Sequence, residues 1–291
     1  MEYEVHMKNW HFRALGIFLA FVIAGIFIAI SINSHTRKID EKQYDILCFG
    51  DSIFGEVRDS TSIPEVLASL TKKRVMNAGI GGTLASYSNK EYRSDAPKDA
   101  LSLVALTKAI KTNDFIVQKS ELARNQITFP YFEEVIMELQ LIDYKKTDVI
   151  YIEQGVNDYM AGVPLENKEE PLDTYTYAGA LRTAIENLKI ACPNATIILC
   201  TPTYMVLFDQ NGTYQTCEEM DFGGGTLPEY AEIVRKVAAE YQLPLLDNYK
   251  DLGIRERTVM LYTLDGLHLA SWAREKMAQQ MYLQWKTLKK P

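Results

Sequence analysis

The feature that most restricts the fold of this chain is a regular alternation of short apolar runs with longer amphipathic stretches after residue 43. The apolar runs have the length of buried strands and span residues 44–49, 74–77, 148–153, 195–201 and 243–247. The amphipathic stretches carry apolar residues at helical spacing and span residues 62–72, 98–111, 131–144, 176–191, 228–242 and 271–288. Repeated strand–helix units build a mostly parallel sheet that is covered on both faces. Because such crossovers are right-handed, the pattern predicts a three-layer α/β/α sandwich.

Length and composition indicate one folded domain with an appendage. The chain has 291 residues, of which 47% are hydrophobic. This is enough for a full core in a domain of about 250 residues. The formal net charge is −7, and there is no long basic run. Since a nucleic-acid-binding protein normally carries a basic face, we expect no nucleic-acid partner.

An uncharged apolar stretch, residues 14–32, is long enough to cross a bilayer as a helix. A core helix of this length would normally have a polar face, and a cleaved signal peptide would have a shorter apolar region before a small-x-small site. Ser31-Ile32-Asn33 is a poor version of that site. We therefore predict an uncleaved transmembrane signal anchor, with a cleaved secreted form as the alternative. Residues 1–13 are then an N-terminal flank, residues 33–43 a polar tether, and residues 44–291 the globular domain.

Histidines are scarce, and this restricts the chemistry of the globular domain. Three of the four histidines flank the apolar stretch, which leaves His268 as the one imidazole of the domain. A multi-histidine metal centre is therefore excluded there, and any imidazole catalysis must use His268. The four cysteines form no C-x-x-C pair and fit no zinc pattern, so we expect neither a metal nor a cofactor. Cys192 and Cys217 could pair, although nothing in the sequence requires it.

Short polar and glycine-rich segments follow the predicted strands. In open α/β sheets, active sites form beyond the carboxyl ends of the strands. Gly50-Asp51-Ser52 follows the first strand, NAGIGG (residues 77–82) the second, and GVND (residues 155–158) the third, while DGLH (residues 265–268) precedes the last helix. The sheet topology is expected to bring these segments together at one edge.

These segments contain each of the groups that acyl transfer requires. A serine hydroxyl such as that of Ser52 is a weak nucleophile and needs a neighbouring base, for which His268 is available. Asp265 precedes His268 by three residues and can orient the imidazole and stabilise its cation. The oxyanion of the intermediate needs hydrogen-bond donors, and the amide of Ser52, a glycine amide of the second segment and the side chain of Asn157 are suitable.

The four segments resemble the sequence blocks of the SGNH/GDSL hydrolase family. Gly50-Asp51-Ser52 matches the first block, residues 77–82 the second, residues 155–158 the third, and Asp265 with His268 the last. Spacing within the second block points to Gly82 as the oxyanion donor. Asp51, Gly155 and Asp158 also lie in matched blocks and are expected to support the catalytic residues.

The resemblance covers about residues 44–288. It implies a flavodoxin-like sheet, a Ser–His–Asp triad and metal-independent ester hydrolysis, with substrates that range from lipids to acylated sugars. The chain is longer than the simplest family members in two places, residues 83–129 and residues 204–227.

Together these features predict a membrane-anchored serine carboxylesterase. The expected substrate is a short acyl ester, such as an O-acetyl group, on a glycan of the cell envelope. The domain is expected to face the cell exterior, although Lys8 and Arg13 before the apolar stretch and Arg37, Lys38 and Lys42 after it do not decide the orientation. The alternatives are an acyltransferase that uses the same triad and an inactive glycan-binding module on the same fold. The oligomeric state is left open.

Overall fold

The computed structural model describes residues 42–88, 97–124 and 129–288, which lie in the unit Lys42–Pro291. The predicted anchor at residues 14–32, its flank and residues 33–41 of the predicted tether lie outside the described residues. Within the described ranges, none of the helices combines the length and apolar character that a membrane span requires.

Five strands form the central sheet, in the order β2-β1-β3-β4-β7. They are β1 (Ile46–Gly50), β2 (Val75–Asn77), β3 (Val149–Glu153), β4 (Thr196–Cys200) and β7 (Leu245–Leu246). Every pairing in this sheet is parallel. With β7 counted as the fifth strand, this is the flavodoxin-like strand order. The inner strands β1 and β3 are buried along their whole length, as expected for a sheet covered on both faces.

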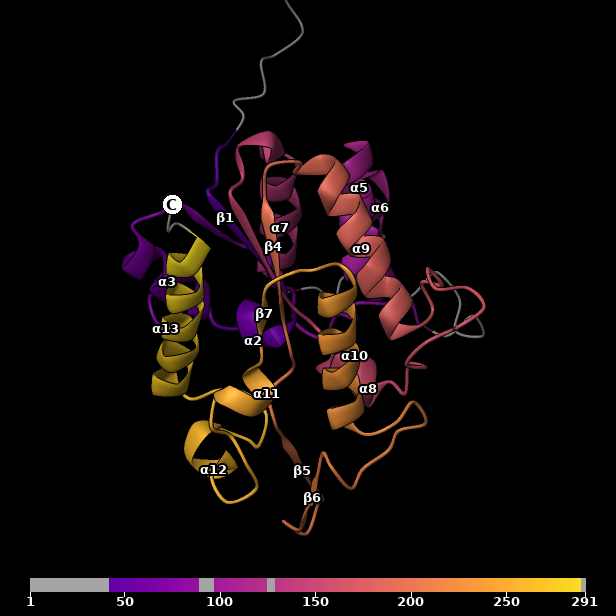
Figure 1. Cartoon of the computed structure of the whole chain (residues 1–291), viewed down its shortest axis with the longest axis vertical. Helices are drawn as coiled ribbons and strands as arrows, with labels where there is room; N and C mark the ends of the chain where they lie inside the picture. The colour runs from indigo at the N-terminus through magenta and orange to yellow at the C-terminus, as the bar shows by residue number, and fades with distance from the viewer. Residues whose placement is uncertain (1–41, 89–96, 125–128, 289–291) are drawn as a thin grey trace, which may run out of the picture. The chain divides into compact units, whose positions relative to one another are not determined.

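Helices cover both faces of the sheet (Figure 1). On one side, α3 (Ile63–Thr71) packs against α13 (Ser271–Leu288); on the other, α9 (Tyr177–Ala191) packs against α5 (Leu103–Thr112) and α10 (Leu227–Glu240). The chain moves from β1 to β2 in one direction across the sheet and from β3 to β4 and β7 in the other. Right-handed crossovers therefore place the connecting helices on opposite faces. The three-layer α/β/α sandwich predicted from the sequence is confirmed.

The segment between β2 and β3 contains more helices than the periodicity predicts. The helix expected over residues 98–111 is divided into α4 (Pro97–Ala100) and α5, because Ser102 caps α5 by accepting a hydrogen bond from the amide of Ala105. The unpredicted α6 (Ile116–Arg124) follows. The helix expected over residues 131–144 is α7 (Pro130–Leu139), which is followed by the short 3-10 helix η1 (Tyr144–Lys146).

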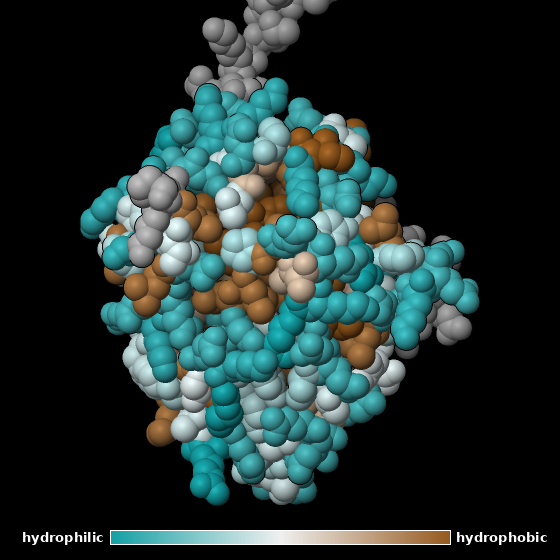
Figure 2. Space-filling view, viewed as in Figure 1, coloured by the Kyte–Doolittle hydropathy of each residue, from teal (hydrophilic) through white to brown (hydrophobic). Residues whose placement is uncertain are grey.

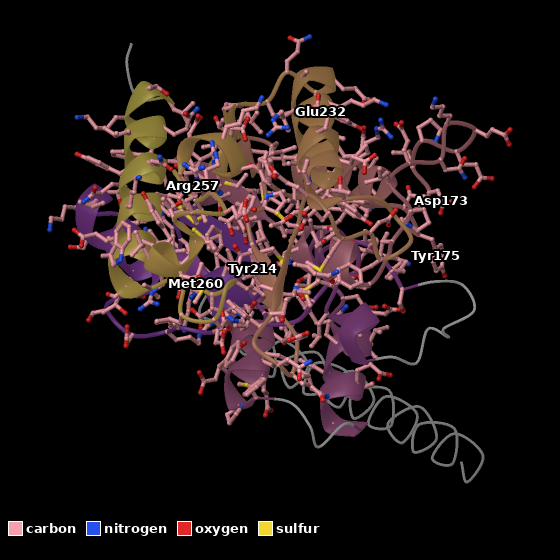
Figure 3. All side chains as sticks on the ribbon, turned by 90° about the horizontal axis from the view of Figure 1, so that it is seen from below. Asp173, Tyr175, Tyr214, Glu232, Arg257 and Met260 are labelled. Atoms are coloured by element: carbon pink, nitrogen blue, oxygen red, sulfur yellow. The ribbon has the colours of Figure 1, made fainter. Side chains whose placement is uncertain are left out.

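Short elements gather at the carboxyl end of the sheet. They are α2 (Ser52–Gly55), α8 (Val156–Met160), β5 (Val206–Phe208), β6 (Tyr214–Thr216), α11 (Asn248–Asp251) and α12 (Val259–Tyr262). Residues 204–227, which show no periodicity, thus contain an antiparallel hairpin of β5 and β6. In the view from this end, Tyr214 of the hairpin and Met260 of α12 lie at the near side of the molecule (Figure 3). A hydrogen bond of 3.1 Å from Tyr214 to Glu256 joins the hairpin to the segment before α12.

The core lies between the sheet and its two helical layers. All four cysteines are buried and unpaired, including Cys192 and Cys217, so they act as small apolar side chains. The surface seen in Figure 2 is mostly hydrophilic, with an apolar area over the edge strand β7 between α13 and α10. Only two residues of β7 pair with β4, so this edge of the sheet is short.

Candidate active site

The first site segment is a sharp turn from β1 into α2. Asp51 is the N-cap of α2, and its carboxylate accepts a hydrogen bond of 3.0 Å from the amide of Ile53. Asp51 is fully buried, whereas Ser52 is half-buried and lines a pocket. The turn therefore directs the Ser52 hydroxyl out of the sheet edge while the carboxylate beneath it stabilises the turn.

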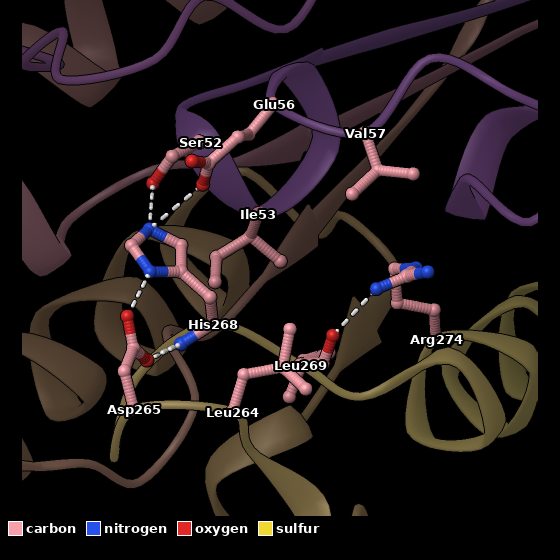
Figure 4. A pocket seen from close by; sticks show the side chains of 9 residues that line it. All are labelled: Ser52, Ile53, Glu56, Val57, Leu264, Asp265, His268, Leu269 and Arg274. Carbon is pink, nitrogen blue, oxygen red and sulfur yellow. Dashed lines mark hydrogen bonds and ion pairs between the residues drawn. The ribbon is translucent and has the colours of Figure 1, made fainter.

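A hydrogen-bond chain links the three residues that the sequence assigns to a triad (Figure 4). Nε2 of His268 lies 3.0 Å from Oγ of Ser52, and Nδ1 lies 2.6 Å from Oδ2 of Asp265. The other oxygen of Asp265 accepts hydrogen bonds from the amides of Leu267 and His268, at 3.0 Å and 2.7 Å. Residues 216 positions apart in the sequence are thus placed at hydrogen-bonding distance.

The carboxylate of Asp265 is suited to remain charged beside the imidazole. Its partial burial would raise the pKa, but the hydrogen bonds from the His268 ring and from the amides of His268 and Leu267 outweigh this effect. The pKa of Asp265 is consequently lower than its ordinary value. An ionised carboxylate at Nδ1 fixes the tautomer in which Nε2 can accept the proton of Ser52.

The loop that carries Asp265 and His268 is held by contacts that the sequence did not reveal. Gly266 has φ 94°, a conformation that favours glycine, and a Cβ atom there would lie 2.6 Å from the carbonyl oxygen of Val206. The carbonyl of Gly266 accepts a hydrogen bond of 3.0 Å from the amide of Val206 in β5. At the end of the loop, Arg274 donates to the carbonyl of Leu269 at 2.6 Å. The β5–β6 hairpin thus supports the histidine loop.

The second glycine segment passes beside Ser52. A Cβ atom built on Gly81 would lie 3.7 Å from Cβ of Ser52, and Gly82 follows directly. The amide of Gly81 donates a hydrogen bond of 3.1 Å to the hydroxyl of Tyr131, on α7. The structure therefore places the predicted oxyanion segment next to the serine and adds Tyr131, which the sequence reasoning missed.

Arg58 ties the same segment to α2. Its guanidinium donates to the carbonyls of Asn77 at 2.8 Å and Gly79 at 3.2 Å, and to that of Gly55 at 3.3 Å. It also lies over the ring of Tyr131, 4.7 Å from the centroid. No sequence motif identifies Arg58 or Tyr131, because the backbone groups of the second segment that they contact are distant from them in the chain.

Asn157 reaches the site from the end of β3. Its Nδ2 donates to the carbonyl of Thr83 at 3.1 Å, so its side chain spans the gap between the third segment and the second. Gly155 precedes α8 with φ 139°, and a Cβ atom there would lie 2.3 Å from the hydroxyl of Tyr177. A residue other than glycine would thus displace the turn that presents Asn157.

Asp158 is not among the residues that line the pocket, and it holds the chain beyond the second glycine segment. Its carboxylate accepts hydrogen bonds from the amides of Ala85 and Ser86, at 2.8 Å and 3.1 Å, and from the hydroxyl of Ser86 at 2.7 Å. Burial raises its pKa, and these hydrogen bonds oppose the increase. Asp158 is therefore a structural link between α8 and residues 85–86.

Two further buried carboxyls lie beneath the serine. Burial raises the pKa of Asp51 to about 7; the Ile53 amide opposes this, and the charge of Asp158 adds to it. Burial, with the charge of Asp51, raises the pKa of Glu153 well above its ordinary value. Glu153 ends β3 and pairs with Gly50 in the sheet register. The surroundings of Glu153 therefore disfavour its charged form.

The pocket beside the triad has a volume of about 230 Å³. It is lined by residues of the first segment and its helix, of the histidine loop and of α13: Ser52, Ile53, Glu56, Val57, Leu264, Asp265, His268, Leu269 and Arg274. Within the described part of the chain, no group of three or more His, Cys, Asp or Glu side chains is arranged to hold a metal ion.

A doubly wound α/β sheet with a serine–histidine–aspartate hydrogen-bond chain at its carboxyl edge is characteristic of serine hydrolases. Residues 48–271 match the model of the GDSL-like lipase/acylhydrolase family. The chain belongs to this family, whose members are hydrolases that act on esters.

Solved structures with the same fold come from several bacteria. One is a possible lipase from Chitinophaga pinensis, with 16% identity and a TM-score of 0.56 over 84% of this chain and 98% of that one. Another is a protein from Lactobacillus plantarum, with 17% identity and a TM-score of 0.56 over 85% and 99% of the two chains. A salicylyl-acyltransferase from a tetracycline biosynthetic pathway shares 14% identity with a TM-score of 0.50, over 85% of this chain and 55% of its own. No curated protein matches the chain.

Proposed function

We propose that this protein is a serine esterase in which Ser52 is the nucleophile, His268 the general base and Asp265 the group that orients the imidazole. The observation that carries the proposal is the continuous hydrogen-bond chain, with 3.0 Å between Ser52 and His268 and 2.6 Å between His268 and Asp265. A catalytic base must lie within hydrogen-bond distance of the proton that it removes, and this geometry meets the requirement.

The reaction proceeds in two displacements. Oγ of Ser52 attacks the ester carbonyl while Nε2 of His268 takes the hydroxyl proton, and a tetrahedral oxyanion forms. Collapse of this intermediate breaks the bond to the alcohol, which leaves with the proton from His268. Water, deprotonated by His268, then attacks the acyl-enzyme, and the carboxylic acid and free Ser52 are released.

Three donors are proposed for the oxyanion: the amides of Ser52 and Gly82 and the side chain of Asn157. Donors aimed at the developing charge need a rigid support, because reorganisation during the reaction would cancel their benefit. The contacts of Arg58 and Tyr131 with the second segment supply such support. Nδ2 of Asn157 donates to the carbonyl of Thr83, and the Asn157 side chain also forms a hydrogen bond with Asp51. These contacts hold the side chain where it is proposed to meet the oxyanion.

We further propose a short acyl group, such as acetyl, as the preferred substituent. The pocket of about 230 Å³ is smaller than the roughly 300–1,000 Å³ typical of sites for drug-sized ligands. The apolar stretch at residues 14–32 supports an attachment to the membrane. We propose that the hydrolase domain lies outside the cytoplasm. With this location, the proposed substrate class is the acylated glycans of the cell envelope.

An acyl-chain series tests the substrate proposal. Full-length protein in detergent is expected to hydrolyse p-nitrophenyl acetate with kcat/KM at least roughly tenfold above that for the octanoate, because a small pocket discriminates by size. Initial rates of p-nitrophenol release measure this, and titration of free acetic acid shows whether water is the acceptor. A maximum at octanoate, or acetyl transfer to an added alcohol without release of acid, would contradict the short-chain hydrolase.

Replacing Asn157 with alanine is expected to lower kcat by on the order of 10²–10³ while KM changes little. An oxyanion donor binds most strongly once charge has developed, so its loss affects the transition state more than the bound substrate. Measurement of kcat, KM and the melting temperature decides the role. If Asn157 only holds the carbonyl of Thr83, the variant would melt at a lower temperature and retain its kcat.

A further inference from the structure

Glu56 lies on the same side of α2 as Ser52, one helical turn further along the chain. Its amide donates to the carbonyl of Ser52 at 3.0 Å, which is the helical i+4 hydrogen bond. Side chains at this spacing lie one above the other on a helix surface. The Glu56 side chain is 59% exposed and lines the pocket beside the triad. Figure 4 shows it reaching over His268 next to the Ser52 hydroxyl.

Oε2 of Glu56 is 3.2 Å from Nε2 of His268, the same nitrogen that faces Ser52. To act as the general base, the imidazole must direct its Nδ1 proton to Asp265 and keep a lone pair on Nε2. A carboxylate cannot form a hydrogen bond with a lone pair. In the described residues His268 is the one side chain that reaches the Glu56 carboxylate. While Nε2 has a lone pair, no described side chain donates to this largely exposed acceptor.

The alcohol part of an ester must come close to Glu56. The departing oxygen receives its proton from Nε2 of His268 and therefore lies about 3 Å from that nitrogen. Since Oε2 of Glu56 is 3.2 Å from Nε2, the departing oxygen is within roughly 6 Å of the carboxylate. A hydroxyl on the neighbouring carbon can then donate to Glu56, whereas a simple alkyl alcohol offers the carboxylate no donor.

The other charged side chains of the pocket do not donate to Glu56 in place of a substrate hydroxyl. Asp265 is also negative. Arg274 is the one arginine or lysine of the pocket lining, and its guanidinium donates to the carbonyls of Thr61 and Leu269 and to the Thr61 hydroxyl. The leaving-group side of the pocket therefore keeps a net negative character.

From this geometry we propose that Glu56 is the residue that selects the alcohol part of the substrate, and that it favours a neutral polyol or sugar ester with a hydroxyl beside the ester oxygen. The inference rests on the proposed esterase function and adds the chemistry of the leaving group to it. Glu56 also lies beside the imidazolium that forms during the reaction. This interaction with the imidazolium occurs with every ester. It therefore cancels when the kcat/KM values of two substrates are compared on the same variant.

A matched pair of esters tests the proposal. trans-2-Hydroxycyclohexyl acetate has a ring hydroxyl next to the ester, and cyclohexyl acetate lacks it. For the full-length protein at pH 8, we expect the hydroxylated ester to have a kcat/KM about tenfold or more above that of its partner, the effect of one hydrogen bond to a charged group. For the Glu56→Ala variant, the ratio of the two kcat/KM values is expected to fall close to one. Glu56→Gln keeps an acceptor without the charge and should give an intermediate ratio.

The control variant is Glu169→Ala, which removes another exposed carboxylate outside the pocket and should keep the wild-type ratio. A wild-type ratio near one, or a high ratio that survives in Glu56→Ala, would overturn the role of Glu56. A wild type that hydrolyses neither ester and does not react with a fluorophosphonate would instead overturn the esterase itself. The ratio depends on the ring hydroxyl of the ester, whereas labelling depends on an activated Ser52, so the two failures are distinguishable.

Discussion

Replacing Ser52 with alanine is expected to lower kcat for p-nitrophenyl acetate by on the order of 10⁵–10⁶ and to abolish covalent labelling by a fluorophosphonate. Loss of the nucleophile removes the acyl-enzyme pathway and leaves only binding and oxyanion stabilisation, and losses of this order follow in other serine hydrolases. The Ser52 hydroxyl contacts the His268 ring, while the turn is held by Asp51. The variant should therefore fold with an unchanged melting temperature.

The measurement combines hydrolysis rates with gel-based labelling of wild type and variant at equal concentration. Ser60→Ala is a suitable control, because Ser60 is exposed and lies outside the pocket lining. It should retain both labelling and turnover. Labelling that persists in Ser52→Ala would show that another residue is the nucleophile.

His268→Ala should be almost as damaging as Ser52→Ala, with a loss in kcat on the order of 10⁵–10⁶. The globular part of the sequence contains no other histidine that could accept the serine proton. Residues of one catalytic unit are not additive, so the Ser52→Ala, His268→Ala double variant should be little worse than either single variant. Steady-state kinetics of the three variants provide the comparison.

Added imidazole separates a chemical role for His268 from a structural one. A small base that enters the space left by the ring should restore part of the activity of His268→Ala, and it should not restore Ser52→Ala. If the double variant instead lost the product of the two single losses, Ser52 and His268 would act independently, and the triad assignment would be wrong.

Much of the fold could be predicted from local patterns. Strands such as β1 and β3 are continuous apolar runs because both faces of the sheet are covered, and α9 and α13 occur where helical spacing is sustained. The division of α4 from α5 was missed because a single side chain, Ser102, caps the second helix inside an otherwise helical pattern. The β5–β6 hairpin was missed because its three-residue strands are too short for alternation to be recognised.

The sequence by itself determined the α/β/α class and the identity of the serine, histidine and aspartate that meet at the site. Strand ends can be recognised locally, parallel strands share one carboxyl edge, and a single histidine in the domain leaves one candidate for the base. Only the tertiary structure decided the distances and the supporting contacts. Tyr131 meets Gly81 from 50 residues away, and the β5 hairpin meets the histidine loop through Gly266. Glu56 meets His268 across 212 positions. Such contacts depend on how helices and loops pack over the sheet edge, and no local periodicity or spacing encodes that packing.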